Sequence, residues 1–178
     1  MKKIITTAIA TAITALSFNA YANIESPFTY LEYSVGNIEY DFTDEDGDYS
    51  ALTGSLELPM LPIPILSVEL IDFGGFDITK IGGGSYLQFG AATHLYGLIH
   101  YNDYDEEDSD FSLTAGVRHI IMDNLYVNAS WTEYTDQDGL DGAKVSLGYY
   151  LHEYVSVSAN YQALDAADVL SISARISF

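Results

Sequence analysis

The 178-residue sequence has no cysteine, only four prolines and only six lysines and arginines. The absence of cysteine excludes disulfide bonds and thiolate metal sites. After residue 22 no apolar run reaches the ~18 residues that a membrane-spanning helix requires. The few cations face 26 acidic residues, for a net charge of −20. Such a chain repels phosphate backbones, which excludes nucleic acid as a partner.

Residues 1–22 have the pattern of a secretory signal peptide. Lys2 and Lys3 precede a mostly apolar stretch over 4–16, and Ala20–Tyr21–Ala22 has the small-residue spacing of a cleavage site. The apolar stretch is too short and too rich in threonine for a membrane anchor. We therefore expect a signal peptide over 1–22 and a single mature domain over 23–178. That domain has 4 cations against 26 carboxylates, a net charge of −22.

The mature chain alternates between strand-like segments and turn-forming clusters. Within each segment apolar and polar side chains alternate with a period of two, as in a strand with one apolar face. The ten segments cover residues 28–42, 49–58, 65–73, 85–92, 95–104, 111–119, 125–134, 143–150, 154–162 and 169–178. The pattern predicts an all-β, up-and-down antiparallel barrel of ten strands, with eight as the alternative. A change of apolar phase in the first segment predicts a bulge near Gly36, and 74–84 is predicted to be a glycine-rich loop.

Two architectures fit this alternation. A soluble sandwich or barrel buries its apolar face inside, whereas a transmembrane barrel turns it outward to lipid. The last segment favours the transmembrane barrel, because in water its apolar face and unpaired backbone groups would form an exposed, aggregation-prone edge. That face consists of Leu170, Ile172, Ala174, Ile176 and Phe178.

A final amphipathic strand of this kind resembles the carboxy-terminal assembly signal of Gram-negative outer-membrane proteins, here Ile176 and Phe178. With the signal peptide and the repeated hairpins, the chain resembles small porin-like outer-membrane barrels of the OmpX and OmpA class. The resemblance implies export through the periplasm to the outer membrane, with both chain ends on the periplasmic side. It also implies a monomer whose partners are outer-membrane lipid, lipopolysaccharide, the barrel-assembly machinery and periplasmic chaperones.

If the polar faces point inward, most of the Lys and Arg side chains of the mature chain point into the lumen. Lipid-facing Arg or Lys costs roughly 2–4 kcal/mol at mid-membrane, and buried charges require partners. We therefore predict a lumen charge network, joined by Tyr126, Tyr150 and Tyr154, of Glu32, Glu57, Glu69, Arg118, Lys144 and Arg175. Lys80 is assigned to the loop over 74–84. Aromatic girdles are predicted from Phe73, Tyr101, Tyr104, Phe111 and Tyr134 at one end, and from Tyr149, Tyr154 and Phe178 at the other.

No catalytic or metal motif emerges from the polar residues. The carboxylates Asp44, Asp46 and Asp48 alternate as in a calcium loop, but the sixth and twelfth positions are Tyr49 and Ser55 instead of Gly and Glu. The four histidines, His94, His100, His119 and His152, match no zinc spacing. His100 is predicted to face the lumen near Asp103. We expect no cofactor, no metal site and no enzyme; loose divalent bridges from the acidic loops to lipopolysaccharide remain a hypothesis.

Three functions remain open on this sequence. The first is a structural barrel or narrow porin-like channel, which would prefer cations because its mouth loops are acidic. The second is a surface interaction or adhesion barrel with a plugged lumen. An outer-membrane enzyme ranks third, because no set of nucleophile, base and orienting group is found.

Overall fold

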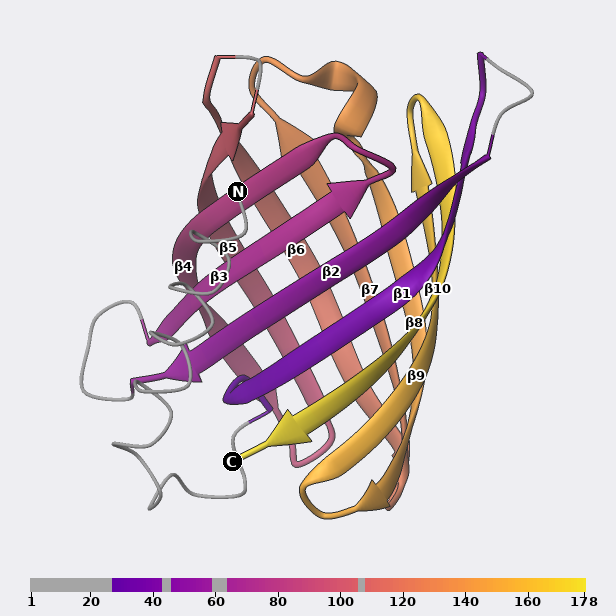
Figure 1. The fold of residues 1–178 in the computed structure, drawn as a ribbon. Helices are drawn as coiled ribbons and strands as arrows, with labels where there is room; N and C mark the ends of the chain where they lie inside the picture. The colour runs from indigo at the N-terminus through magenta and orange to yellow at the C-terminus, as the bar shows by residue number, and fades with distance from the viewer. Residues whose placement is uncertain (1–26, 43–45, 59–63, 106–107) are drawn as a thin grey trace.

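A computed structural model describes residues 27–42, 46–58, 64–105 and 108–178 and shows one closed barrel (Figure 1). The ten antiparallel strands confirm the predicted architecture. The predicted signal peptide over 1–22, the start of the acidic stretch at Asp44, and Pro59 and Pro62 lie outside the described residues. The strands are β1 (Tyr30–Tyr40), β2 (Asp46–Glu57), β3 (Ile65–Phe73), β4 (Asp77–Phe89), β5 (Thr93–Tyr104), β6 (Asp110–Met122), β7 (Leu125–Tyr134), β8 (Gly142–His152), β9 (Val155–Leu164) and β10 (Ala167–Ser177).

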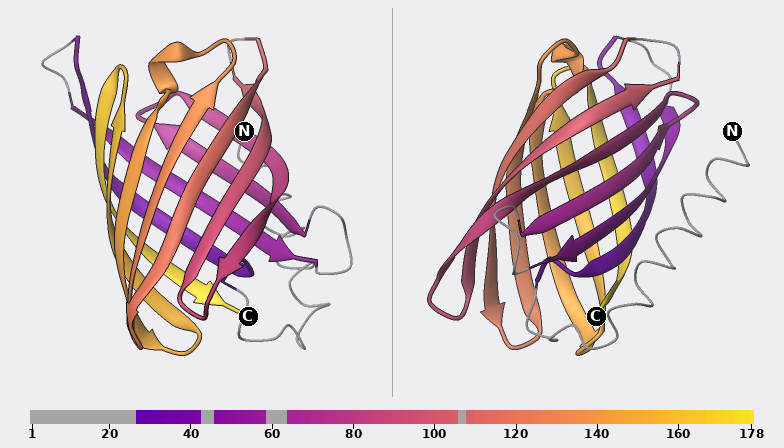
Figure 2. Two further views of the ribbon diagram at one scale, coloured as in Figure 1. Left: turned by 180° about the vertical axis from the view of Figure 1, so that it is seen from behind. Right: turned by 90° about the vertical axis from the view of Figure 1, so that its left-hand side faces the viewer.

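Each strand pairs with its neighbours in sequence, and β1 closes the barrel against β10. The closing register places Ser34 opposite Ser173, so neither strand leaves an unpaired edge. Connections after odd-numbered strands lie at one end, which we call the loop end. The other end, which we call the terminus end, holds the remaining connections, Phe28 and Phe178 (Figure 2). One short 3-10 helix, η1 (Asp138–Leu140), lies in the β7–β8 connection. The described residues include no helix long and apolar enough to cross a bilayer.

The apolar faces of the strands point outward. Ile172 is 66% exposed, whereas the neighbouring Ser173 is 5% exposed. Leu147 and Val157 are likewise exposed, and Ser146 and Ser158 are buried. The side chains that a water-soluble barrel would pack inside are therefore on the exterior, and hydroxyl groups line the interior.

The predicted glycine-rich loop is wrong, because β4 begins at Asp77 rather than at 85. The β3–β4 turn is tight: Gly74 and Gly75 have φ of 66° and 111°, values that glycine adopts readily. A Cβ on Gly84 would overlap the backbone of Gly97 on β5. Glycine here permits close approach of two strands instead of forming a loop.

The predicted bulge at Gly36 is also wrong. β1 pairs with β2 and with β10 in one continuous register, so Ile38 stays on the inward face and is buried. The change of phase in the sequence therefore marks a change from polar to apolar lining of the lumen. Register shifts occur elsewhere, between Ile120 and Met122 and between Tyr150 and His152.

Apolar side chains fill the lumen at the loop end. This loop-end cluster consists of Ile38, Tyr49, Ala51, Ile71, Phe73, Ile78, Tyr104, Leu164, Ala167 and Val169, with Tyr40, Phe76 and Leu140 packed against it. Phe73, Tyr104 and Tyr134, which the sequence assigned to an outer girdle, point inward and are buried. Tyr101 and Phe111 do lie on the exterior, where their rings are 5.6 Å apart. The aromatic girdle at this end therefore contains fewer rings than predicted.

Candidate functional site

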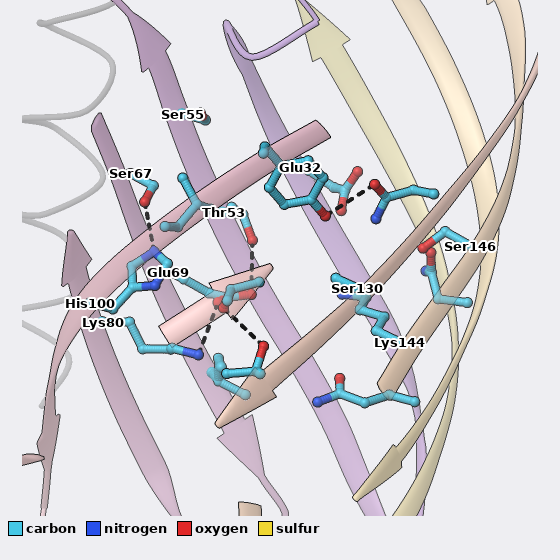
Figure 3. A pocket seen from close by; sticks show the side chains of 18 of the residues that line it. Glu32, Thr53, Ser55, Ser67, Glu69, Lys80, His100, Ser130, Lys144 and Ser146 are labelled. Carbon is cyan, nitrogen blue, oxygen red and sulfur yellow. Dashed lines mark hydrogen bonds and ion pairs between the residues drawn. The ribbon is translucent and has the colours of Figure 1, made fainter. Parts of the chain in front are cut away.

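The lumen below the loop-end cluster holds a polar cavity of about 150 Å³. Its lining combines hydroxyl, amide and charged side chains with aromatic and aliphatic ones, from strands all around the barrel (Figure 3). The lining includes Glu32, Glu69, Lys80, Arg118, Lys144 and Arg175. A barrel of this width leaves room for a few water molecules or one small polar group.

Arg175 and Glu32 form the shortest ion pair in the described part of the chain. They are directly opposite each other on β10 and β1, and Arg175 Nε donates to Glu32 Oε2 at 2.7 Å. The guanidinium also lies 3.8 Å from the centre of the Tyr30 ring. Both side chains are largely buried, so each charge depends on the other for compensation.

Glu69 pairs with Lys80, the cation that the sequence placed in a loop. The two residues are opposite each other on β3 and β4, with Lys80 Nζ 3.8 Å from Glu69 Oε2. Thr53 donates to Glu69 at 3.3 Å, and Lys80 donates to the Tyr134 hydroxyl at 2.8 Å. The sequence carried little signal for this strand, because its inward residues Ile78, Lys80 and Gly82 differ in polarity and glycine marks neither face.

The other three predicted charges also face the lumen but bind differently. Arg118 donates to the Tyr150 hydroxyl at 2.7 Å and covers the ring of Tyr126 at 4.0 Å. Glu57 accepts from the Tyr86 hydroxyl at 2.6 Å. No hydrogen bond or ion pair joins Lys144 to another described residue, although it lies within electrostatic reach of Glu32 and Glu69.

These contacts divide the six predicted lumen charges into separate groups. Among the described residues, Glu32 with Arg175 is the one hydrogen-bonded pair within the predicted set of six. Tyr126 and Tyr150 face the lumen and contact each other at 5.2 Å between ring centres. Tyr154 instead stacks on His152 near the β8–β9 turn.

His100 points into the lumen, but its partner differs from the predicted one. Its Nε2 lies 2.7 Å from Ser67 Oγ, while Asp103 is exposed on the opposite face of β5. In the part of the chain that the structure describes, His100 Nδ1 has no hydrogen-bond partner. A serine nucleophile needs a histidine oriented by a third group, and no described residue bonds His100 in that way.

Aromatic rings narrow the terminus end of the lumen. Phe28 lies 4.8 Å from Tyr86 and 5.6 Å from Tyr96, between ring centres, and His94 packs against the same group. The polar cavity is thus bounded by aromatic side chains at this end and by the loop-end cluster at the other.

The residues of the predicted assembly signal lie on β10 or just beyond it. Ile176 is exposed on the exterior, opposite Leu31 and Val155. The Phe178 amide donates to the Thr29 carbonyl at 3.2 Å. The final strand is therefore integrated into the closed sheet to its end.

We expect Gly148→Ala to destabilise the barrel by about 1–3 kcal/mol. The new Cβ would overlap the ring of Tyr126, which is buried and held under Arg118 and so cannot move aside freely. Gly54→Ala is the matched control, because its Cβ would meet nothing closer than Leu31 Cδ1 at 4.0 Å. Denaturant unfolding of the two variants in detergent measures the difference; equal midpoints would contradict a rigidly packed lumen.

Comparison with known proteins identifies similar folds but no family. No family model matches the sequence, and no curated protein matches it. Among solved structures the KdgM porin, alone and in complex with disordered oligogalacturonate, is similar in fold. In both cases the TM-score is 0.54 and identity is 10%, over 84% of this chain and 99% of the porin. The COG4313 outer membrane channel from Pseudomonas putida F1 aligns with a TM-score of 0.48 and 8% identity, over 84% of this chain and 93% of that one.

Proposed function

We propose that this chain is an integral outer-membrane β-barrel with a narrow, porin-like lumen. The observation that carries the proposal is a closed barrel with an apolar exterior and a charged, hydroxyl-rich interior. Only closed barrels and helices satisfy all backbone hydrogen bonds in lipid. The shared fold of the KdgM porin supports the same reading. A signal peptide over 1–22, outer-membrane assembly through Ile176 and Phe178, and a monomeric state belong to this proposal.

The lumen is too narrow for a general diffusion pore in the conformation described. The loop-end cluster closes one end with apolar side chains, which exclude water and ions unless they move. The acidic connections around this mouth include the exposed Asp105 and Asp108 and attract cations, so ions that pass would be mainly cations. The function proposed is therefore a restricted channel whose opening depends on the loop-end cluster.

Conductance measurements test this proposal directly. In planar bilayers we expect small or rare current steps from the wild-type barrel, and larger steps from the double variant Ile38→Ser/Phe73→Ser. Both substitutions remove apolar groups that fill the loop-end mouth and replace them with side chains that bind water. Reversal potentials across a salt gradient should show cation preference.

Phe89→Ser is the matched control, because Phe89 is 57% exposed on the exterior of β4. It should leave the current unchanged. If the widened variant is as silent as the wild type while still folded, as shown by a heat-modifiable gel shift, the channel proposal fails.

The second candidate is a surface interaction barrel with a plugged lumen. It is favoured by the same loop-end cluster, in which Leu140 of η1 packs over the barrel end. Two results together would support this function over a channel. Neither the wild type nor the double variant Ile38→Ser/Phe73→Ser would carry current, and the acidic loops would bind cells or extracellular matrix.

A further inference from the structure

Arg118 is a buried cation that forms no direct ion pair with a described carboxylate. It is 4% exposed. One of its nitrogens donates to the Tyr150 hydroxyl, but Nε has no hydrogen-bond partner in the described ranges. A buried N–H donor without an acceptor is unfavourable, so an oxygen atom from a bound group would stabilise Nε, for which the described residues supply none.

Arg175 carries a second buried donor and lines the same cavity. Its Nε is used by Glu32, but Nη1 is buried with no partner among the described atoms. The two guanidinium groups both lie against Tyr126, at 4.0 Å for Arg118 and 5.9 Å for Arg175. Both side chains line the polar cavity.

The charges around these two donors favour an anion. Glu32 pairs directly with Arg175, and the cations Arg118 and Lys144 also lie within its electrostatic reach, so three positive charges surround this one carboxylate. The hydroxyls of Tyr126 and Ser156, 3.5 Å apart, are the neighbouring polar groups. Arginine donors bind the oxygens of phosphate or carboxylate groups through charge-assisted, often bidentate hydrogen bonds.

We propose that Arg118 and Arg175 form a binding site for the oxyanion group of a small solute, phosphate or carboxylate, in the terminus half of the lumen. The proposal rests on the porin-like lumen proposed above and names the chemistry that it recognises. Arg118 lies near the terminus end of β6 and Arg175 near the terminus end of β10. In the proposed membrane orientation, this end is the periplasmic side. The acidic mouth lies at the opposite end, so the anion would enter from the periplasm.

Calorimetric titration of the folded barrel in detergent with sodium phosphate tests the site, with sodium acetate as the carboxylate probe. We expect saturable binding that weakens as sodium chloride is raised. Arg118→Gln should weaken phosphate binding about tenfold or more, since a hydrogen bond to a charged group is lost along with the charge. The phosphate affinity of Arg118→Lys should lie between those of the wild type and Arg118→Gln, because lysine keeps the charge but lacks the planar, bidentate donors of the guanidinium.

Lys80→Gln is the control for loss of one lumen charge, because Lys80 is already bonded to Glu69 and Tyr134. It should weaken binding much less than Arg118→Gln. An absence of saturable binding by the wild type, or an equal loss in both variants, overturns the site; a heat-modifiability gel establishes that each variant is folded. Binding without conductance would contradict the channel and leave this site standing, and conductance without binding would do the reverse.

Discussion

Arg175→Met is expected to destabilise the barrel by about 3–5 kcal/mol, the usual cost of removing one partner of a buried ion pair. The substitution leaves the Glu32 carboxylate buried without its 2.7 Å partner and removes the cation that covers Tyr30. The measurement is the free energy of unfolding in lipid vesicles by denaturant titration, followed by the fluorescence of Trp131, the single tryptophan.

The double variant Glu32→Gln/Arg175→Met separates loss of the pair from loss of packing. Without the stranded carboxylate, much of the lost stability should return, because a neutral amide is less costly to bury than a charge. If Arg175→Met unfolds at the wild-type denaturant concentration, the pair carries no net stability and the lumen charges are solvated. If the double variant is as unstable as the single one, packing of the arginine stem is the larger contribution.

Ile172→Arg is expected to destabilise the barrel by roughly 2–4 kcal/mol in lipid vesicles, as for a cation at mid-membrane. Ile172 is at the middle of β10 and is 66% exposed on the exterior. In a water-soluble barrel a residue so exposed would tolerate arginine with a change of about 0.5 kcal/mol or less. The same substitution therefore distinguishes the two environments by its magnitude.

Ile172→Leu is the control, because it keeps an apolar side chain of the same size in the same place. It should unfold at the wild-type denaturant concentration. Two outcomes would contradict the membrane assignment on which the proposed function depends. One is that Ile172→Arg has the same free energy of unfolding as the wild type; the other is that this variant is recovered as a dissolved monomer after export.

The strand pattern was predictable because it depends on local geometry. Side chains alternate strictly between the two faces of a strand, so the parity of Glu32, Arg118 and Arg175 could be inferred from their neighbours before any pairing was known. The ten-strand count was correct for the same reason. The errors arose where glycine interrupts the pattern: at Gly36 an uninterrupted strand was interpreted as a bulge, and over 77–84 a strand was interpreted as a loop.

Those errors share one physical cause. Glycine has no side chain to reveal its face, and it serves both tight turns and close strand contacts. In this barrel Gly74 and Gly75 form the turn, while Gly84 lies against the backbone of β5. The missed strand carries Lys80, so the error concealed the partner of Glu69.

The amino-acid sequence by itself determined which side chains share a face, since a period of two needs no information from other strands. The same alternation fitted two architectures, and the final strand favoured the one with a polar interior. Only the tertiary structure decided that Glu32 meets Arg175, that Glu69 meets Lys80, and that Arg118 pairs with no carboxylate in the described part of the chain. Those partners depend on the register between strands, and in a closed barrel the register is set by the closure of all ten strands together.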